Sequence, residues 1–181
     1  MELTEKQVSS ELKYKGVIVD VYLDRAELCD GKIARREVVK HPGGVTVLPV
    51  DSDGMCYMVR QYRYPIGEVT LEVPAGKLDA PDEDPLVCAE RELSEETGYT
   101  AARITKLTTI ATTVGFSNEK IHLYAAEGLT AGKQHTDEDE FINVVKVPLE
   151  EAVAMAQDGR IVDAKSVISI LMLAAQQNAA K

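Results

Sequence analysis

The sequence predicts an α/β fold, a mixed β-sheet covered by helices on both faces, with a small antiparallel β subdomain in front of it. Strand-like segments come first, a helical pattern follows, further strands come next, and two helical segments end the chain. A doubly wound fold needs strict alternation of strand and helix, which this order lacks. A break at His41-Pro42-Gly43-Gly44 divides the chain into a predicted subdomain, residues 1–42, and a main domain, residues 43–181.

The amino-terminal segments are expected to form two antiparallel hairpins. Lys15–Leu23 alternates with β-branched residues and is followed, after the turn Cys29–Lys32, by Ile33–Lys40. The second hairpin is expected from Val45–Val50 and Met55–Gln61, which flank a short polar turn.

A helix is predicted in the middle of the chain. The strand Val69–Val73 ends at Pro74, and residues 77–84 are expected to be loop. Pro85 suits the first turn of a helix, and Gly98 ends it. The apolar residues expected on one helical face are Leu86, Ala89 and Leu93.

The rest of the chain predicts three strands and two helices. The strands are Ile104–Thr112, Lys120–Ala126 and Phe141–Val147. The helices are Leu149–Gln157, which Gly159 ends, and Ala164–Ala175. The tail from Ala174 to Lys181 is expected to fray.

Composition and charge exclude several classes of protein. The 181 residues include 30 acidic and 20 basic side chains, and a net charge of −10 argues against binding to long nucleic acid. No apolar run is long enough for a membrane span, and no secretion signal is apparent. Cys29, Cys56 and Cys88 form no CxxC pair, which is typical of reduced thiols in a cytoplasmic protein.

Three carboxylates are expected on one side of the central helix. Residues three and four positions apart share a helical face, which brings Glu92, Glu95 and Glu96 together. Their repulsion costs about 0.2–0.5 kcal/mol per pair, and a bound divalent cation would reverse it. Such oxygen ligands suit Mg²⁺, with Mn²⁺ as a substitute. On composition alone, a solvated acidic surface is the alternative.

The order of residues around these carboxylates resembles the Nudix box. The run is Arg91-Glu92-Leu93-Ser94-Glu95-Glu96-Thr97-Gly98-Tyr99, preceded by Glu83 and by Gly76-Lys77-Leu78, with one extra residue between Gly76 and Glu83. The resemblance implies a Nudix-type α/β/α sandwich. It also implies metal ligands, which would be Glu92, Glu95, Glu96 and the backbone carbonyl of Ala75. Arg91 would orient the carboxylates.

Two further segments are similar to the ADP-ribose pyrophosphatase branch of the Nudix family. One is Arg60-Gln61-Tyr62-Arg63 leading into Leu71–Leu78, and the other is Asp163–Ser166. The similarity implies hydrolysis of ADP-ribose to AMP and ribose 5-phosphate. It implies substrate binding by Arg63, at the diphosphate, and by Glu72.

The amino-terminal subdomain is expected to contribute to a homodimer, as the resemblance to dimeric ADP-ribose enzymes implies. Arg35 and Arg36 lie next to each other on a predicted strand and therefore point to opposite faces. At most one of them should reach a substrate site, and Arg36 is the preferred candidate. In a symmetric dimer, one subunit would supply it to its neighbour.

Hydrolysis also needs a base that activates water. Glu92 and Glu96 would hold the metal and so take part in catalysis without serving as the base. The resemblance places the base in the loop before Phe141, where Glu140 is the first candidate and Glu138 the second. A solvated acidic loop is the alternative.

Two other functions fit the same residues. The chain could cleave another nucleotide sugar, such as GDP-mannose, or a dinucleoside polyphosphate. Val114 stands where the ADP-ribose branch commonly has a proline, which widens the range of expected substrates. A module that binds a nucleotide sugar without cleaving it is also possible, but loss of box carboxylates is its expected mark, and all are present here.

Overall fold

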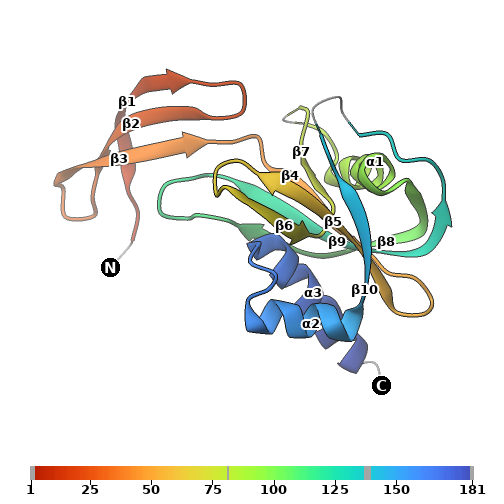
Figure 1. Cartoon of the computed structure of the whole chain (residues 1–181). Helices are drawn as coiled ribbons and strands as arrows, with labels where there is room; N and C mark the ends of the chain where they lie inside the picture. Colours follow the sequence, from red (N-terminus) through yellow and green to blue (C-terminus); the bar gives the residue numbers. More distant parts are fainter. Residues whose placement is uncertain (1–2, 81, 137–139, 180–181) are drawn as a thin grey trace. The chain divides into compact units, whose positions relative to one another are not determined.

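The computed structural model describes residues 3–80, 82–136 and 140–179, and these divide into two compact units. The first unit comprises Met1–Gly43 with Ala111–Lys120, and the second comprises Gly44–Ile110 with Ile121–Lys181. Figure 1 labels the helices and strands of both units. The Glu138 candidate lies outside the described residues.

The first unit contains an antiparallel sheet in the order β1-β2-β3, formed by Lys6–Lys15, Asp20–Glu27 and Ile33–Lys40. The predicted pairing across the turn at residues 29–32 is confirmed, and Gly31 has the positive φ of 82° that this turn needs. The predicted strand Lys15–Leu23 was wrong at its start, because a turn there separates β1 from β2. The sequence did not predict β1, because all ten residues of this strand are exposed and its apolar and polar residues do not alternate regularly as in a half-buried strand.

The segment 111–120 lies against β3 in the first unit. The Val39 amide donates to the Phe116 carbonyl at 2.7 Å, and the Asn118 amide donates to the Val39 carbonyl at 3.2 Å. This is the turn in which Val114 stands, and its pairing with β3 was not predicted.

The second unit contains a mixed four-stranded sheet in the order β7-β4-β9-β8 and a three-stranded sheet in the order β10-β5-β6. β4 pairs parallel with β9 and antiparallel with β7, so the predicted mixed sheet is confirmed. The strands are β4 (Gly44–Pro49), β5 (Met55–Arg63), β6 (Glu68–Glu72), β7 (Ala75–Lys77), β8 (Tyr99–Ala111), β9 (Lys120–Ala131) and β10 (Asn143–Pro148).

Two local predictions in this unit were wrong. The expected hairpin between Val45–Val50 and Met55–Gln61 is reduced to one bridge, Val50 with Cys56, and the two strands belong to different sheets. All six residues of β4 are buried, and such a strand pairs on both sides within a sheet centre. The expected loop at 77–84 begins one residue later, because Ala75–Lys77 forms the short strand β7.

The helices of this unit are α1 (Pro85–Thr97), α2 (Leu149–Asp158) and α3 (Ala164–Ala179). Side chains of β4 point alternately to two hydrophobic clusters, so Val45 and Val47 pack with Leu93 of α1. Leu48 packs in the other cluster, with Ile170 of α3. Helices therefore cover both faces, as predicted for the sandwich (Figure 1).

Helix α1 begins and ends where the sequence predicted. The Asp84 side chain accepts from the Leu86 amide, Pro85 occupies the first turn, and Gly98 ends the helix with a φ of 74°. Leu86 was wrongly expected in the buried face. Its exposed fraction is 37%, and Cys88, which is fully buried, lies beside Ala89 and Leu93 instead.

Helix α2 follows Pro148 and ends at Gly159, as predicted. Helix α3 continues to Ala179, four residues beyond the expected Ala175. The prediction that the chain frays from Ala174 was therefore wrong for residues 174–179. Among the described residues, no helix combines the length and apolar character needed to cross a bilayer.

The two glycines that end α1 and α2 provide a matched test of packing at the first helix end. Both have positive φ, but a Cβ at Gly159 would meet nothing within 4 Å, whereas a Cβ at Gly98 would lie 2.7 Å from the Gln134 amide nitrogen. Gly159→Ala should therefore lower the free energy of unfolding by about 1 kcal/mol, the backbone cost alone. Gly98→Ala should lower it by at least about 1 kcal/mol more. Urea denaturation measures both, and equal losses would contradict this packing.

Candidate active site

Two carboxylates of α1 are buried on one helical turn. Glu92 and Glu96 lie four residues apart and have exposed fractions of 8% and 2%. Glu95 shares this turn but is more exposed, and it accepts a hydrogen bond from Arg91 at 3.2 Å. The predicted convergence therefore holds most closely for the buried pair.

The backbone from Pro74 to Gly76 lies directly against this pair. The Ala75 amide donates to Oε2 of Glu96 at 3.0 Å. A Cβ at Gly76 would collide with the Glu92 carboxylate, so any larger residue here would have to displace that carboxylate. The Pro74 carbonyl accepts from the Thr46 hydroxyl and the Val47 amide, both at 2.9 Å, which fixes the segment to β4.

Burial makes the charged pair costly. It raises the pKa of Glu92 to about 7 and that of Glu96 to about 8, and the negative charges of neighbouring carboxylates add to the effect. The Ala75 amide and Arg91 act in the opposite direction, on Glu96 and Glu92 respectively. Two adjacent buried carboxylates are a donor set of hard oxygens that a divalent cation would stabilise. The residues present thus fit the predicted metal.

The pair is not by itself a complete metal cage. Among residues 3–80, 82–136 and 140–179, no group of three His, Cys, Asp or Glu side chains is arranged to hold an ion. Magnesium commonly takes one or two protein carboxylates and leaves its other positions to water and substrate phosphates. A buried pair of carboxylates is consistent with that kind of coordination.

Arg91 links the acidic groups around the box. Its Nη1 donates to Oε1 of Glu92 at 2.7 Å, and its Nη2 lies 3.3 Å from Asp79 and 3.5 Å from Glu83. Glu83 also accepts from the Asp79 amide at 2.6 Å. In this structure Glu83 therefore closes the longer box loop and balances Arg91.

Gln134 and His135, which precede Glu140 in the chain, bond to the end of α1. The His135 amide donates to the Glu95 carbonyl at 3.1 Å, and the Gln134 side chain donates to the Glu96 carbonyl at 2.6 Å. These bonds use carbonyls that a helix end leaves unsatisfied. The Thr136 hydroxyl donates to the Glu140 carbonyl at 3.0 Å, and the Glu140 charge acts on Glu92 and Glu96. Sequence reasoning did not find this tether.

Arg63 and Glu72 line a second part of the site, a pocket of about 450 Å³. Arg63 donates to the Glu72 carboxylate through Nε and Nη2, at 2.7 and 2.6 Å. This pairing raises the pKa of Arg63, and the charges of Asp163 and Glu96 add to it, so Arg63 lies within electrostatic range of the buried pair.

The Glu72 carboxylate is almost fully buried. It also accepts from the Thr70 hydroxyl at 2.6 Å and from Lys165. Burial alone would raise the pKa of Glu72, but Arg63, Lys165 and Thr70 outweigh it and lower the pKa to about 2. Lys165 was not among the predicted site residues. A lysine two positions after Asp163, on the apolar face of a helix, was the available signal.

The two arginines of the amino-terminal subdomain lie on β3, in the first unit. Arg35 is exposed, whereas Arg36 is partly buried and forms an ion pair with Glu5 at 2.6 Å. Arg36 also donates to the Arg35 carbonyl at 2.9 Å. Their substrate contacts stay predictions.

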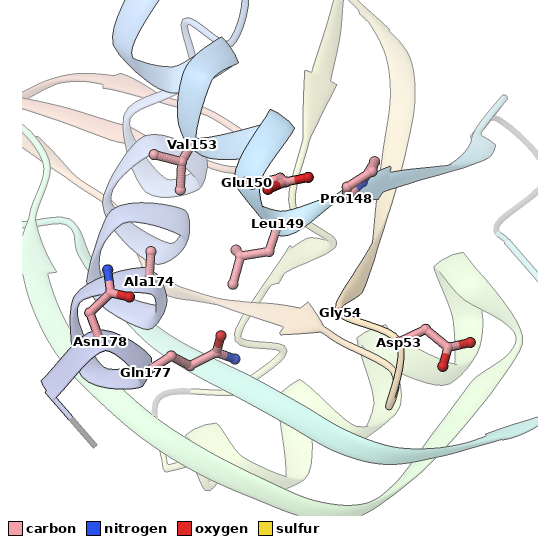
Figure 2. A pocket seen from close by; sticks show the side chains of 9 residues that line it. All are labelled: Asp53, Gly54, Pro148, Leu149, Glu150, Val153, Ala174, Gln177 and Asn178. Carbon is pink, nitrogen blue, oxygen red and sulfur yellow. The ribbon is translucent and has the colours of Figure 1, made fainter. Parts of the chain in front are cut away.

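Another pocket, of about 570 Å³, lies between α2, α3 and the turn at Gly54 (Figure 2). Its lining includes none of the predicted site residues. Asp53 and Glu150 are its charged groups, and neither has a cationic partner among the lining side chains that Figure 2 shows.

The chain belongs to the Nudix family, since residues 40–168 match the NUDIX domain. It is 43% identical to the ADP-ribose pyrophosphatase of Bacillus subtilis (strain 168) over 173 residues, 94% of this chain and 93% of the relative. It is also 41% identical, over 96% of this chain and 94% of the relative, to a protein of Bacillus methanolicus named methanol dehydrogenase activator. The resemblance to the ADP-ribose pyrophosphatase branch is thereby confirmed.

A solved structure supports the fold. The crystal structure of ADP compounds hydrolase superposes with a TM-score of 0.86 and covers 99% of this chain and 98% of its own. Its sequence identity is 21%, so the likeness concerns the fold alone.

The contact between Gly76 and Glu92 gives a test of the acidic pair. Gly76→Ala should push the Glu92 carboxylate away and reduce metal-dependent hydrolysis by about 100-fold, because a displaced carboxylate loses its place in the site. Gly54→Ala is the control. It puts a side chain at a positive φ of 75° with open space around it, so it should lower stability while activity persists. Turnover and thermal unfolding are measured for both. Full activity of Gly76→Ala would contradict the proposed contact.

Proposed function

We propose that the protein hydrolyses the diphosphate bond of ADP-ribose to give AMP and ribose 5-phosphate, in a reaction that depends on a divalent metal. The observation that carries the proposal is the buried pair Glu92 and Glu96, packed against the backbone of Ala75 and Gly76. The similarity to an ADP-ribose pyrophosphatase along almost the whole chain supports the choice of substrate.

The metal would be Mg²⁺, with Mn²⁺ as a substitute, held by Glu92, Glu96 and the Ala75 carbonyl, with Glu95 beside them. When bound, such an ion neutralises charge on the phosphates and lowers the pKa of a water molecule. The chain's own part is to keep two carboxylates close together and shielded from solvent. Arg91 holds Glu92 in place, and the Ala75 amide holds Glu96.

Arg63 would bind the diphosphate, since a planar guanidinium donates two parallel hydrogen bonds to phosphate oxygens. Glu72 would act on the substrate through Arg63, because both oxygens of Glu72 already accept hydrogen bonds from it. In a homodimer, Arg36, with Arg35 as the second candidate, would approach the substrate from the neighbouring subunit.

Glu140 would be the general base. Two observations support this role: Gln134 and His135, which precede Glu140, bond to the end of α1, and the Glu140 charge acts on both Glu92 and Glu96. As Glu140 takes a proton from water, the hydroxyl oxygen bonds to one phosphorus. The bridging P–O bond breaks, and the other phosphate leaves with the bridging oxygen. Glu138 is the second candidate.

The test is nucleoside monophosphate release from a panel of substrates with Mg²⁺: ADP-ribose, GDP-mannose and a dinucleoside polyphosphate. ADP-ribose should give the highest kcat/KM.

Glu96→Gln should lower turnover by at least about 100-fold, since one buried ligand is lost. Glu140→Gln should lower kcat by about 100-fold or more with a smaller change in KM. Glu90→Gln, on the exposed side of the same helix, is the control and should keep wild-type activity.

The outcomes separate the alternatives. A preference for another substrate would contradict the choice of ADP-ribose but not the proposed pyrophosphatase activity. Binding without release of any monophosphate would identify a non-catalytic module instead. Normal activity of Glu96→Gln would contradict the metal assignment.

We also propose that the protein is a homodimer whose subunits meet through the β1-β2-β3 sheet. Every residue of β1 is exposed, including Val8, Leu12 and Tyr14, and a small sheet of this kind gains stability when a partner covers it. Sedimentation at micromolar concentration should give about twice the mass of one chain. Leu12→Lys should shift it toward one chain, because a charge would then enter the interface. A wild-type protein that sediments as a single chain would contradict the proposal.

The site of action would be the cytoplasm. Cys29, Cys56 and Cys88 are all free thiols, and reduced cysteines are typical of that compartment.

A further inference from the structure

Helix α3 begins with a group of residues that bond to one another and to the strand region in front of the acidic pair. Asp163 accepts from the Ser166 amide at 3.0 Å and from the Lys165 ammonium at 2.8 Å. The Ser166 hydroxyl in turn accepts from the Val73 amide at 2.7 Å. This end of the helix is therefore fixed to residue 73, two positions before Ala75.

Lys165 reaches from this helix end to the Glu72 carboxylate. Its side chain has an exposed fraction of only 10%, and it donates to Oε2 of Glu72 as well as to Asp163. A buried ammonium is costly unless it is paired, and here it is paired twice. Lys165 is therefore locked in one position.

Glu72 carries two cations that differ in exposure. Lys165 is buried, whereas the side chain of Arg63 is 39% exposed and lines the pocket of about 450 Å³. Lys165 and Nη2 of Arg63 donate to Oε2 of Glu72, whereas Nε of Arg63 and the Thr70 hydroxyl donate to Oε1. Lys165 and Thr70 therefore orient the carboxylate from two sides, and the carboxylate orients Arg63.

A purely structural role would have Lys165 neutralise Glu72 and nothing more. Arg63 already forms a bidentate pair with Glu72, so neutralisation alone does not require a second buried cation. What a second cation changes is the direction in which the carboxylate holds Arg63.

We infer that Lys165, locked between Asp163 and Glu72, is a positioning residue that presents the Arg63 guanidinium to the diphosphate group of the substrate. The inference rests on the proposed function for the identity of the ligand. It adds that the start of α3 determines how well a diphosphate binds. Lys165 itself touches no substrate.

The main variant is Lys165→Met, which keeps the length of the side chain and removes its charge. Glu72 then lacks one of the donors that fix the direction of its carboxylate, so the Arg63 guanidinium is no longer held in the position that meets a phosphate. The double variant Lys165→Met with Glu72→Gln removes both buried charges. This double variant should regain the stability that Lys165→Met loses. In the double variant, however, Arg63 no longer has a charged carboxylate to hold it. Lys120→Met, at an exposed lysine, is the matched control.

Three quantities are measured: the thermal midpoint, the dissociation constant of ADP-ribose by calorimetry in EDTA, and kcat and KM with Mg²⁺. Lys165→Met should weaken ADP-ribose binding about 10-fold or more and raise KM more than it lowers kcat. The double variant should recover the thermal midpoint but not the affinity. The control should match the wild type throughout.

Wild-type affinity in Lys165→Met would overturn the inference, and so would recovery of both stability and affinity in the double variant, because neutralisation would then explain everything. Failure of the wild type to bind ADP-ribose would also overturn it. If the wild type binds ADP-ribose without cleaving it, and Lys165→Met weakens that binding, the proposed function fails and the positioning role stands.

Discussion

The burial of two like charges on one turn of a helix is the constraint on which the rest of the site depends. Glu92 and Glu96 repel each other and lose hydration, so surrounding groups must hold them in place. Arg91 does so on one side and the Ala75 amide on the other, while Gly76 leaves room for the Glu92 carboxylate. The fold thus holds together two carboxylates whose ionised forms a divalent cation would stabilise.

Much of the fold could be predicted, because its signals are local. Asp84, Pro85 and Gly98 mark the ends of α1 through capping and backbone geometry, and β3 follows a turn that contains a glycine. The same locality explains the failures. β1 has no buried face, so its sequence shows no regular alternation of apolar and polar residues. β4 is buried throughout and pairs with strands on both sides, which the nearest turn does not indicate.

The site divides in the same way. The carboxylates of α1 are close in sequence, so helix periodicity predicts from the sequence that they share one face. Lys165 and its partner Glu72 are 93 positions apart, and the tether from Gln134 to the Glu96 carbonyl spans 38. No spacing rule connects such residues. Resemblance to a family indicated the segments that carry Glu72 and Lys165, but not the contact between them.

The backbone segment of Val73, Pro74 and Ala75 receives a hydrogen bond or donates one at each residue, to α3, β4 and α1 respectively. These partners lie 93, 28 and 21 positions away along the chain. The segment is thus fully ordered only after residue 166 has been synthesised and docked. A growing chain on the ribosome would therefore carry every acidic residue of α1 before it could anchor the segment in front of them at Val73.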